Sequence, residues 1–161
     1  EFNLDKIRKI MEVNYFGTMN SINSVYDYYN DKKSGQISII SSIAGYRGLP
    51  AAGAYCASKS ALTSFTESLY FEMKRVNVNV SLISPGFIKT PMTDENDFPM
   101  PMIKSPEFAA SQIYNGLIKN KSFEIHFPKA FTFLMKIIQI LPNWIYFHTI
   151  NFGNKYMKRD K

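Results

Sequence analysis

Apolar residues recur every three or four positions through much of the chain, which is the spacing of one buried helix face. The pattern predicts a long helix over residues 4–31, a second over 54–75 and a third over 105–119. Ser105-Pro106-Glu107 supports the third start, because a capping hydroxyl, a proline in the first turn and an early acid are typical there.

Short runs rich in β-branched residues separate these helices. Residues 36–41, 77–84 and 123–127 are each predicted to form a buried strand. Helices that alternate with strands favour an α/β fold with a parallel sheet and helices on its faces. In such sheets ligands bind beyond the carboxyl ends of the strands, so chemistry is expected in the loops that begin at Ser41 and Ser84.

Ser42 follows the first strand, and Tyr55 and Lys59 lie one turn apart on the next helix. The Tyr-x-x-x-Lys spacing alone carries little weight, because this chain repeats it at three other places. These are Tyr28/Lys32, Tyr29/Lys33 and Tyr70/Lys74. Only Tyr55 and Lys59 begin a helix that follows a strand and a serine-bearing loop, so we predict that they carry chemistry.

The three side chains suit proton transfer at a carbonyl oxygen. Reducing a carbonyl with hydride needs a proton donor, and the reverse reaction needs a base at the alcohol. A free tyrosine has a pKa near 10. We expect the Lys59 ammonium to lower the pKa of Tyr55, and we expect the Ser42 hydroxyl to hold the substrate oxygen.

Three motifs in this order resemble those of the short-chain dehydrogenase/reductase family. They are Ser41-Ser42-Ile43-Ala44-Gly45, Tyr55-Cys56-Ala57-Ser58-Lys59 and Ser84-Pro85-Gly86-Phe87-Ile88-Lys89-Thr90. Val13-Asn14-Tyr15-Phe16-Gly17 is similar to the family's segment on the preceding helix, and the match spans roughly residues 4–127. The resemblance implies a Rossmann-like, doubly wound parallel sheet.

The resemblance also implies roles for individual residues. Tyr55 would be the general acid/base and would contact both the substrate and the cofactor. Lys59 would bind the nicotinamide ribose, Ser42 would bind the substrate carbonyl, and Asn14 would complete the catalytic set. Residues of the third motif would bind the cofactor, NAD or NADP. These are Pro85, Gly86 and Ile88 at the nicotinamide and Thr90 at the diphosphate. Gly86 should in addition let the backbone approach a ligand and leave amide donors exposed.

The loop after this motif, residues 92–103, sits where the family places its substrate-binding loop. Its methionines, with Met92 first, suit an apolar and variable small-molecule ligand, although packing of the loop on the protein's own core explains them equally well.

The chain departs from the family pattern before Asn14. Neither the glycine-rich turn Thr-Gly-x-x-x-Gly-x-Gly nor the later Asn-Asn-Ala-Gly segment occurs, and the first residue, Glu1, is not a Met. We therefore expect only the carboxyl-terminal half of the Rossmann-like sheet with its flanking helices, and an upstream segment outside this sequence. Residues 1–128 would form this part, and 129–161 an apolar, basic extension.

Charge and composition bear on nucleic-acid binding, disulfides, metal sites and localisation. The net charge is +6, but from Lys129 onward six basic residues face one acid, which accounts for five of the six. A basic surface for nucleic acid is therefore not indicated. Cys56 is the only cysteine and His126 and His148 are isolated, so we expect no disulfide, no metal site and a cytoplasmic setting.

Residues 131–141 are apolar except for a narrow stripe at Thr132, Lys136 and Gln139, and aromatic and basic residues follow. This combination is typical of a helix on an anionic membrane surface, and equally of one that covers an active site or a neighbouring subunit. The helices 4–31 and 54–75 are expected to form a homo-oligomer, as such helices commonly do in the family.

The sequence thus predicts reversible hydride transfer between NAD(P)H and a lipophilic carbonyl/alcohol pair. The alternative is an inactive or regulatory relative that acts by association, with a membrane surface among its partners, because the cofactor-binding turn is absent.

Overall fold

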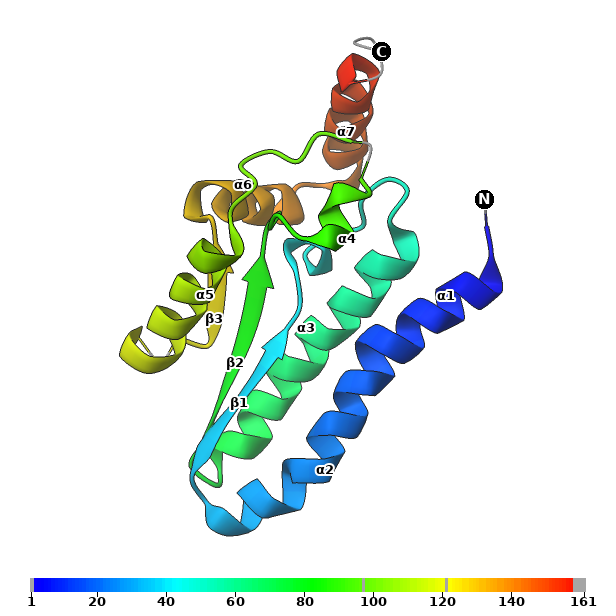
Figure 1. Cartoon of the computed structure of the whole chain (residues 1–161). Helices are drawn as coiled ribbons and strands as arrows, with labels where there is room; N and C mark the ends of the chain where they lie inside the picture. Colours follow the sequence, from blue (N-terminus) through cyan, green and yellow to red (C-terminus); the bar gives the residue numbers. More distant parts are fainter. Residues whose placement is uncertain (1, 97, 121, 158–161) are drawn as a thin grey trace.

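The computed structural model describes residues 2–96, 98–120 and 122–157. Three parallel strands lie at its centre in the order β1-β2-β3 (Figure 1). Their bounds are β1 (Gly35–Ile40), β2 (Val78–Pro85) and β3 (Glu124–Phe127). The predicted parallel α/β sheet is therefore confirmed, with each strand displaced from its predicted bounds by about one residue.

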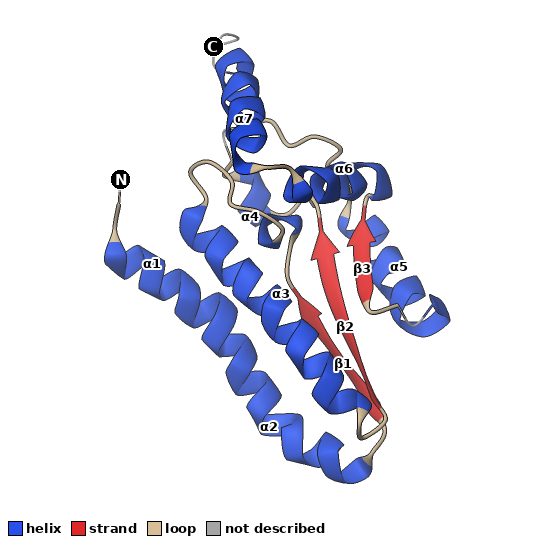
Figure 2. Cartoon of the chain, turned by 180° about the vertical axis from the view of Figure 1, so that it is seen from behind, coloured by secondary structure: helices blue, strands red, loops and turns tan. Residues whose placement is uncertain are grey.

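Helices pack on both faces of this sheet (Figures 1 and 2). One face is covered by α2 (Gly17–Lys32) and α3 (Gly53–Lys74), with α1 (Leu4–Met11) packed against α3, and the other by α5 (Pro106–Tyr114) with the π-helical turn Asn115–Asn120. Successive residues of β2 serve the two faces, since Val80 packs in the α2/α3 cluster and Ile83 in the α5 cluster.

The first predicted helix is continuous but changes its winding. Residues Glu12–Phe16 form a π-helical segment between α1 and α2, and Asn14 lies within it. A π segment is a local insertion that re-aims side chains and is frequent at functional sites. The helix then ends at Lys33 in the left-handed conformation, and Gly35 follows with φ +142°, where a side chain would collide with the Tyr29 ring.

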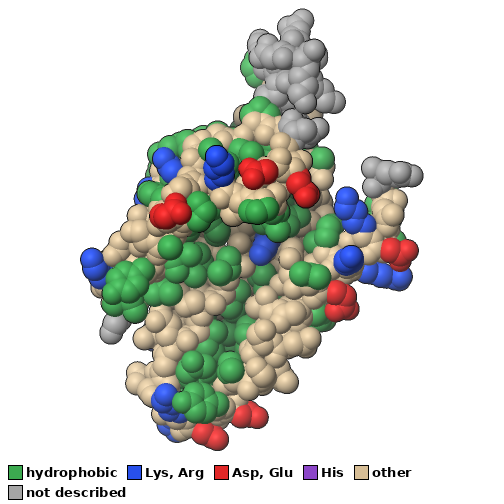
Figure 3. Space-filling view, in the orientation of Figure 1, with side chains coloured by type: hydrophobic (Ala, Val, Ile, Leu, Met, Phe, Trp, Pro, Cys, Tyr) green, Lys and Arg blue, Asp and Glu red, His purple; other side chains and the backbone are tan. Residues whose placement is uncertain are grey.

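The face of β1 that points away from α3 carries no helix among the described residues (Figure 1). Ile40 is exposed on it, and hydrophobic side chains lie across this side of the molecule in Figure 3 with few charges among them. An apolar sheet face of this kind is normally covered in an α/β fold. The open face therefore agrees with a chain that holds one half of a doubly wound sheet.

Two further helices lie beyond the carboxyl ends of the strands. α6 (Lys129–Ile140) lies across the end of the sheet and α7 (Asn143–Met157) projects away from the body (Figures 1 and 2). The short helix α4 (Pro91–Asp94) lies nearby, inside the segment predicted to be a loop. An isolated parallel bridge between Ile88 and Lys104 closes that segment at its base.

α6 exposes several apolar side chains, while two of its polar side chains face the protein. Thr132 is fully buried and Lys136 reaches the partly buried Glu124 carboxylate, whereas the apolar Phe133, Leu134 and Ile140 face outward. Ile140 is 79% exposed and Trp144, at the start of α7, is 74% exposed. Thr132 and Lys136 of the narrow polar stripe therefore face the protein, as does the apolar Met135, whereas Gln139 of the same stripe is exposed.

Candidate active site

Ser42, Tyr55 and Lys59 lie at the carboxyl end of β1, where the sequence places them. Ser42 follows β1 after one residue and is buried, while Tyr55 and Lys59 occupy the first two turns of α3 and are partly buried. The loop between β1 and α3 is short enough to bring the start of α3 back beside the strand end. The Lys59 Nζ atom lies 5.8 Å from the centre of the Tyr55 ring.

The Ser42 hydroxyl is oriented by the backbone on either side of it. It accepts a hydrogen bond from the Ala44 amide at 3.2 Å and lies 3.5 Å from the Pro85 carbonyl on β2. Ser42 thereby caps a single 3-10 turn, Ile43–Gly45, in which all three residues are buried. A Cβ on Gly45 would lie 2.8 Å from the Lys59 carbonyl oxygen, so this turn packs against α3 more closely than a side chain permits.

The electrostatics of Tyr55 differ from the expectation. Burial raises the pKa of Tyr55 above its ordinary value, and the neighbouring Ser42 hydroxyl acts in the opposite direction with a smaller effect. The lowering of this pKa that was expected from Lys59 is not found, because burial is the largest influence on the phenol. The Lys59 ammonium donates to the Ile40 carbonyl at 3.1 Å and lies over the face of the Tyr55 ring. Burial also lowers the pKa of Lys59.

Asn14 reaches this site through one intermediate residue. Its Nδ2 atom donates to the Ser58 hydroxyl at 3.0 Å, and the Ser58 hydroxyl donates to the Tyr55 carbonyl at 2.8 Å. Ser58 is fully buried. The π-helical segment that carries Asn14 is thus tied to the turn of α3 that carries Tyr55, so Asn14 sets the backbone beneath the tyrosine.

The loop after β2 provides the predicted cofactor-binding residues. Pro85, Gly86 and Ile88 are partly buried beside the strand end. The prediction of an exposed amide donor at Gly86 is wrong, because this amide donates to the Phe127 carbonyl at 2.8 Å. A Cβ on Gly86 would lie 3.2 Å from both Pro128 and Phe131, so close packing against the start of α6 accounts for this glycine.

Thr90 and Met92 lie further along the same loop. Thr90 caps the start of α4, where the Thr93 hydroxyl accepts from the Thr90 amide at 2.8 Å. Met92 is 74% exposed. The contacts of the described residues do not bring Met92 onto Ser42 or Tyr55, so its part in substrate binding stays a prediction.

The arrangement fits one end of a nicotinamide dinucleotide. Lys59 offers three donors and uses one on Ile40, which leaves donors for ribose hydroxyls at the mouth of the site. Pro85 and Ile88 offer an apolar wall for a flat ring. The sequence has no glycine-rich turn to cradle a pyrophosphate, so Thr90 is the one residue of this chain predicted to reach the diphosphate.

Comparisons with known proteins agree with this fold. Residues 1–99 match the family model described as short chain dehydrogenase. The chain is 25% identical to a short-chain dehydrogenase from Burkholderia cenocepacia solved in complex with NADP, with a TM-score of 0.79 over 92% of this chain and 60% of that one. These findings define a Rossmann-like α/β protein. The chain belongs to the short-chain dehydrogenase family.

Two curated relatives set the extent of the match. An uncharacterized oxidoreductase of Myxococcus xanthus is 32% identical over 139 residues, which are 86% of this chain and 54% of that protein. Dehydrogenase/reductase SDR family member 7B of Mus musculus is 41% identical over 87 residues, which are 54% of this chain and 27% of that protein. The chain therefore spans about half, or less, of the relatives that it matches.

Several residues at the site carry no individual prediction from the sequence. Ser58 links Asn14 to Tyr55, and Ser60 donates to the Gly45 carbonyl at 2.9 Å. Tyr46 and Arg47, directly after the Ser42 turn, contact β3, α6 and α7. A polar contact of Lys136 could have been predicted from the sequence, because a lysine in the narrow polar stripe of an apolar helix needs a partner if that stripe is buried.

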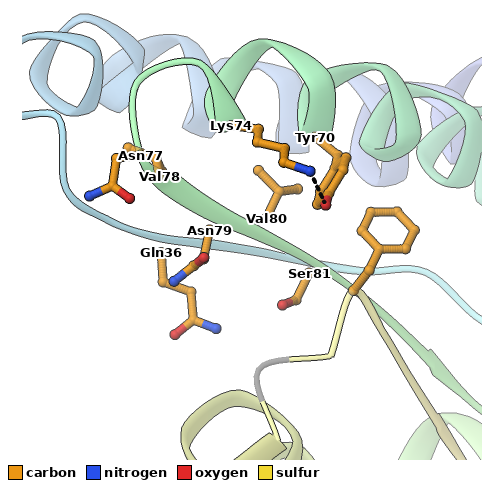
Figure 4. Close-up of a pocket in the computed structure, with 9 residues that line it drawn as sticks. Gln36, Tyr70, Lys74, Asn77, Val78, Asn79, Val80 and Ser81 are labelled. Atoms are coloured by element: carbon orange, nitrogen blue, oxygen red, sulfur yellow. Dashed lines mark hydrogen bonds between the residues drawn. The ribbon is translucent and has the colours of Figure 1, made fainter.

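A separate cavity of about 290 Å3 lies at the opposite end of the sheet, where β2 begins before its pairing with β3 (Figure 4). Its lining includes Tyr70 and Lys74, whose ammonium donates to the phenol oxygen at 3.3 Å, together with Asn79 and Ser81. The cavity contains none of the predicted site residues. Within the described ranges no group of three or more His, Cys, Asp and Glu side chains could hold a metal ion.

Proposed function

We propose that the protein containing this chain is an NAD(P)-dependent oxidoreductase that interconverts a carbonyl and an alcohol. The observation that carries the proposal is the convergence of Ser42, Tyr55 and Lys59 at the carboxyl end of β1 in a chain of the short-chain dehydrogenase family. The cofactor supplies or accepts the hydride when it is bound. The residues of this chain hold the substrate oxygen and exchange its proton.

Each residue has a distinct task in the reduction direction. Ser42 donates a hydrogen bond to the carbonyl oxygen, and Tyr55 transfers its phenolic proton to that oxygen as negative charge develops there. The raised pKa of Tyr55 suits this step, because the residue stays a phenol at neutral pH. Lys59 holds the ribose, and Asn14 fixes the backbone of Tyr55 through Ser58.

The substrate is proposed to be lipophilic. Met92, Phe98, Met102 and Ile103 are exposed on the loop beyond β2, next to the carboxyl ends of the strands. Flexible methionines and aromatic rings on such a loop can close on an apolar molecule and adapt to its shape.

The decisive experiment replaces Tyr55 by Phe in the complete protein, with Tyr70→Phe as a matched control. Tyr70 and Lys74 have the same spacing on the same helix but lie beside the cavity at its far end. With a saturating substrate, Tyr55→Phe should lower kcat by about 100-fold or more, and Tyr70→Phe should leave it unchanged. Retention of most turnover by Tyr55→Phe would contradict the proposal.

A regulatory role by association is the rival function, and the absence of a pyrophosphate-binding turn favours it for the chain taken alone. Isothermal titration of the complete protein with NADH and NADPH separates the two. Binding of either cofactor supports the enzyme, and no heat at millimolar cofactor supports the rival.

We further propose that α6 and α7 contact an anionic membrane surface. The outward apolar face of α6, the exposed Trp144 and the excess of basic residues after Lys129 support this contact. Within the described residues, no helix is both long and apolar enough to cross a bilayer. Ile140→Asp should therefore reduce flotation with anionic liposomes, whereas Ile118→Asp, at a 55% exposed residue in the π-helical turn after α5, should not. Equal flotation of both variants would refute the contact.

We propose a homo-oligomer that forms through the outward surface of the helices on the α3 side of the sheet. Val13, Phe16 and Phe71 expose apolar side chains there. Light scattering of the complete protein should give a multiple of the single-chain mass, and a monomer at micromolar concentration would refute this proposal.

A further inference from the structure

Arg47 joins the loop that carries Ser42 to the corner between α6 and α7. Its Nη1 atom donates to the carbonyls of Ile138, Gln139 and Leu141 at 3.0, 3.1 and 2.6 Å. These carbonyls belong to the last turn of α6 and the residue after it, where a helix leaves most carbonyls without a backbone donor, although the Ile138 carbonyl also accepts from the Leu141 amide at 3.3 Å. A single guanidinium therefore caps α6.

The same guanidinium also holds the start of α7. Its Nη2 atom donates to the Asn143 Oδ1 atom at 2.5 Å, and its central carbon lies 4.0 Å from the centre of the Tyr146 ring. The Tyr146 hydroxyl donates back to the Gly48 carbonyl, next to Arg47 in the sequence. Arg47 is thus fixed from two helices, with its planar donors and its cationic face both in use.

Tyr46 makes a second connection from the same loop. Its hydroxyl donates at 2.5 Å to one carboxylate oxygen of Glu124 on β3, and Lys136 of α6 donates to the other oxygen. The Tyr46 ring packs with Ile43 and Met135 in a buried cluster between the loop and α6. α6 therefore contacts the Ser42 loop through the apolar Met135, and it reaches Tyr46 a second time through the Glu124 carboxylate that Tyr46 and Lys136 share.

Both connections begin directly after the turn that orients Ser42. Ser42 caps the turn, the Tyr46 amide donates to the Ile43 carbonyl at 3.0 Å, and Arg47 follows. We propose that Arg47 is a positioning residue for the Ser42 hydroxyl, and that the docking of the α6–α7 corner on Arg47 sets the place of that hydroxyl against Tyr55. Arg47 itself contacts neither Ser42 nor Tyr55 by any hydrogen bond of the described residues.

This arrangement makes the position of the carbonyl-binding hydroxyl depend on two helices that are distant in the sequence. A change of about 1 Å in the placement of a catalytic group can cost up to about 100-fold in rate. A ligand or surface that contacts the apolar side of α6 and α7 and displaces these helices would then move Arg47, and with it the Ser42 hydroxyl, and so change the reaction rate. The inference rests on the proposed oxidoreductase function, since it assigns Ser42 to the substrate oxygen.

A double-mutant cycle in the complete protein tests the inference. Arg47→Met keeps the aliphatic stem and removes the donors, Ser42→Ala removes the hydroxyl, and Arg75→Met removes an exposed arginine at the far end of α3 as a control. We expect Arg47→Met to lower kcat by about 10- to 100-fold, with a smaller change in the KM for the cofactor. Arg75→Met should leave both constants unchanged.

The double variant gives the sharpest result. If Arg47 acts through Ser42, Arg47→Met should cost little once the hydroxyl is gone, so the double variant should match Ser42→Ala within about threefold. Multiplicative losses, or an Arg47→Met enzyme of normal kcat, would overturn the inference. A Ser42→Ala enzyme of normal kcat would instead contradict the proposed function.

Hydrogen exchange provides a reading that does not depend on activity. Arg47→Met should speed amide exchange in peptides that cover residues 42–49 and 138–147, while the strand peptides keep their protection. If the variant fails to fold, Arg47→Lys replaces it, because a lysine keeps the charge but cannot reach several acceptors together. Unchanged exchange over residues 42–49 in a folded variant would also overturn the inference.

Discussion

Replacement of Lys136 by Met tests the buried contact on which α6 rests. Lys136 donates to one oxygen of the Glu124 carboxylate, and Tyr46 donates to the other. The Lys136 side chain is 35% exposed and that of Glu124 is 20% exposed, so the pair is only partly screened by water. Met keeps the apolar contacts of the lysine stem and removes the ammonium alone.

The magnitude follows from the hydrogen bond that is lost. A hydrogen bond to a charged group contributes about 1.5–3 kcal/mol, and the exposure of Lys136 places its share at the lower end. We expect Lys136→Met to lower the free energy of unfolding by about 1–2 kcal/mol at pH 7. Lys129→Met, at the exposed start of the same helix, should change it by less than about 0.5 kcal/mol.

The pKa of Glu124 decides how the free energy of unfolding changes with pH. Burial alone would raise the pKa of Glu124, but hydrogen bonds from Lys136 and Tyr46 lower it below its ordinary value. The stability that this carboxylate contributes is therefore present above the ordinary glutamate pKa of about 4.5, and it is lost as the pH falls through the lowered value.

Without Lys136 the effect of burial prevails, and the folded variant takes up a proton at a higher pH. The stability gap between the two proteins should then narrow between pH 7 and pH 4. Urea unfolding followed by circular dichroism at four pH values measures it. A gap that is the same at every pH, or no gap at pH 7, would refute the role of the Glu124 contact.

Three other predictions concern the active site. Because burial raises the pKa of Tyr55, the rate of alcohol oxidation should rise about tenfold per pH unit up to that pKa. The rate of carbonyl reduction should not change through neutral pH, and steady-state rates in both directions check this. Gly45→Ala places a Cβ 2.8 Å from the Lys59 carbonyl and should cost about 1–3 kcal/mol in thermal unfolding. Asn14→Ala removes the donor to Ser58 and should cost about 0.5–1.5 kcal/mol while lowering kcat, and unchanged values of both would contradict the role of Asn14.

The elements of the sheet could be predicted because their signals are local. The β-branched runs 36–41 and 77–84 alternate with helical periodicity, and parallel pairing follows from that order. The place of Ser42 and Tyr55 could be predicted for the same reason, since both lie within one strand-loop-helix unit. The family motifs then indicated their tasks.

The remaining features depend on contacts between distant segments. No local pattern distinguishes the π-helical winding at Asn14 from an ordinary helix, because its partner Ser58 is 44 residues away. The sequence around Arg47 indicates only a loop residue, because its partners at the α6–α7 corner lie more than 90 residues later. The lowering of the Tyr55 pKa was wrongly expected because spacing gives the distance to Lys59 but not the degree of burial.

The inward position of two polar side chains of α6 also depends on contacts between distant segments. A helix placed over β3 must meet Glu124 and His126, which lie two residues apart on one face of the strand. Lys136 and Thr132, four residues apart on one face of α6, meet them, with His126 and Thr132 in hydrogen-bond contact at 2.6 Å. Because Thr132 and Lys136 face the strand, the apolar Phe133, Leu134 and Ile140 on the other side of α6 are exposed. The contacts that hold α6 on β3 thus leave apolar side chains outward on the helix whose last turn Arg47 joins to the Ser42 loop.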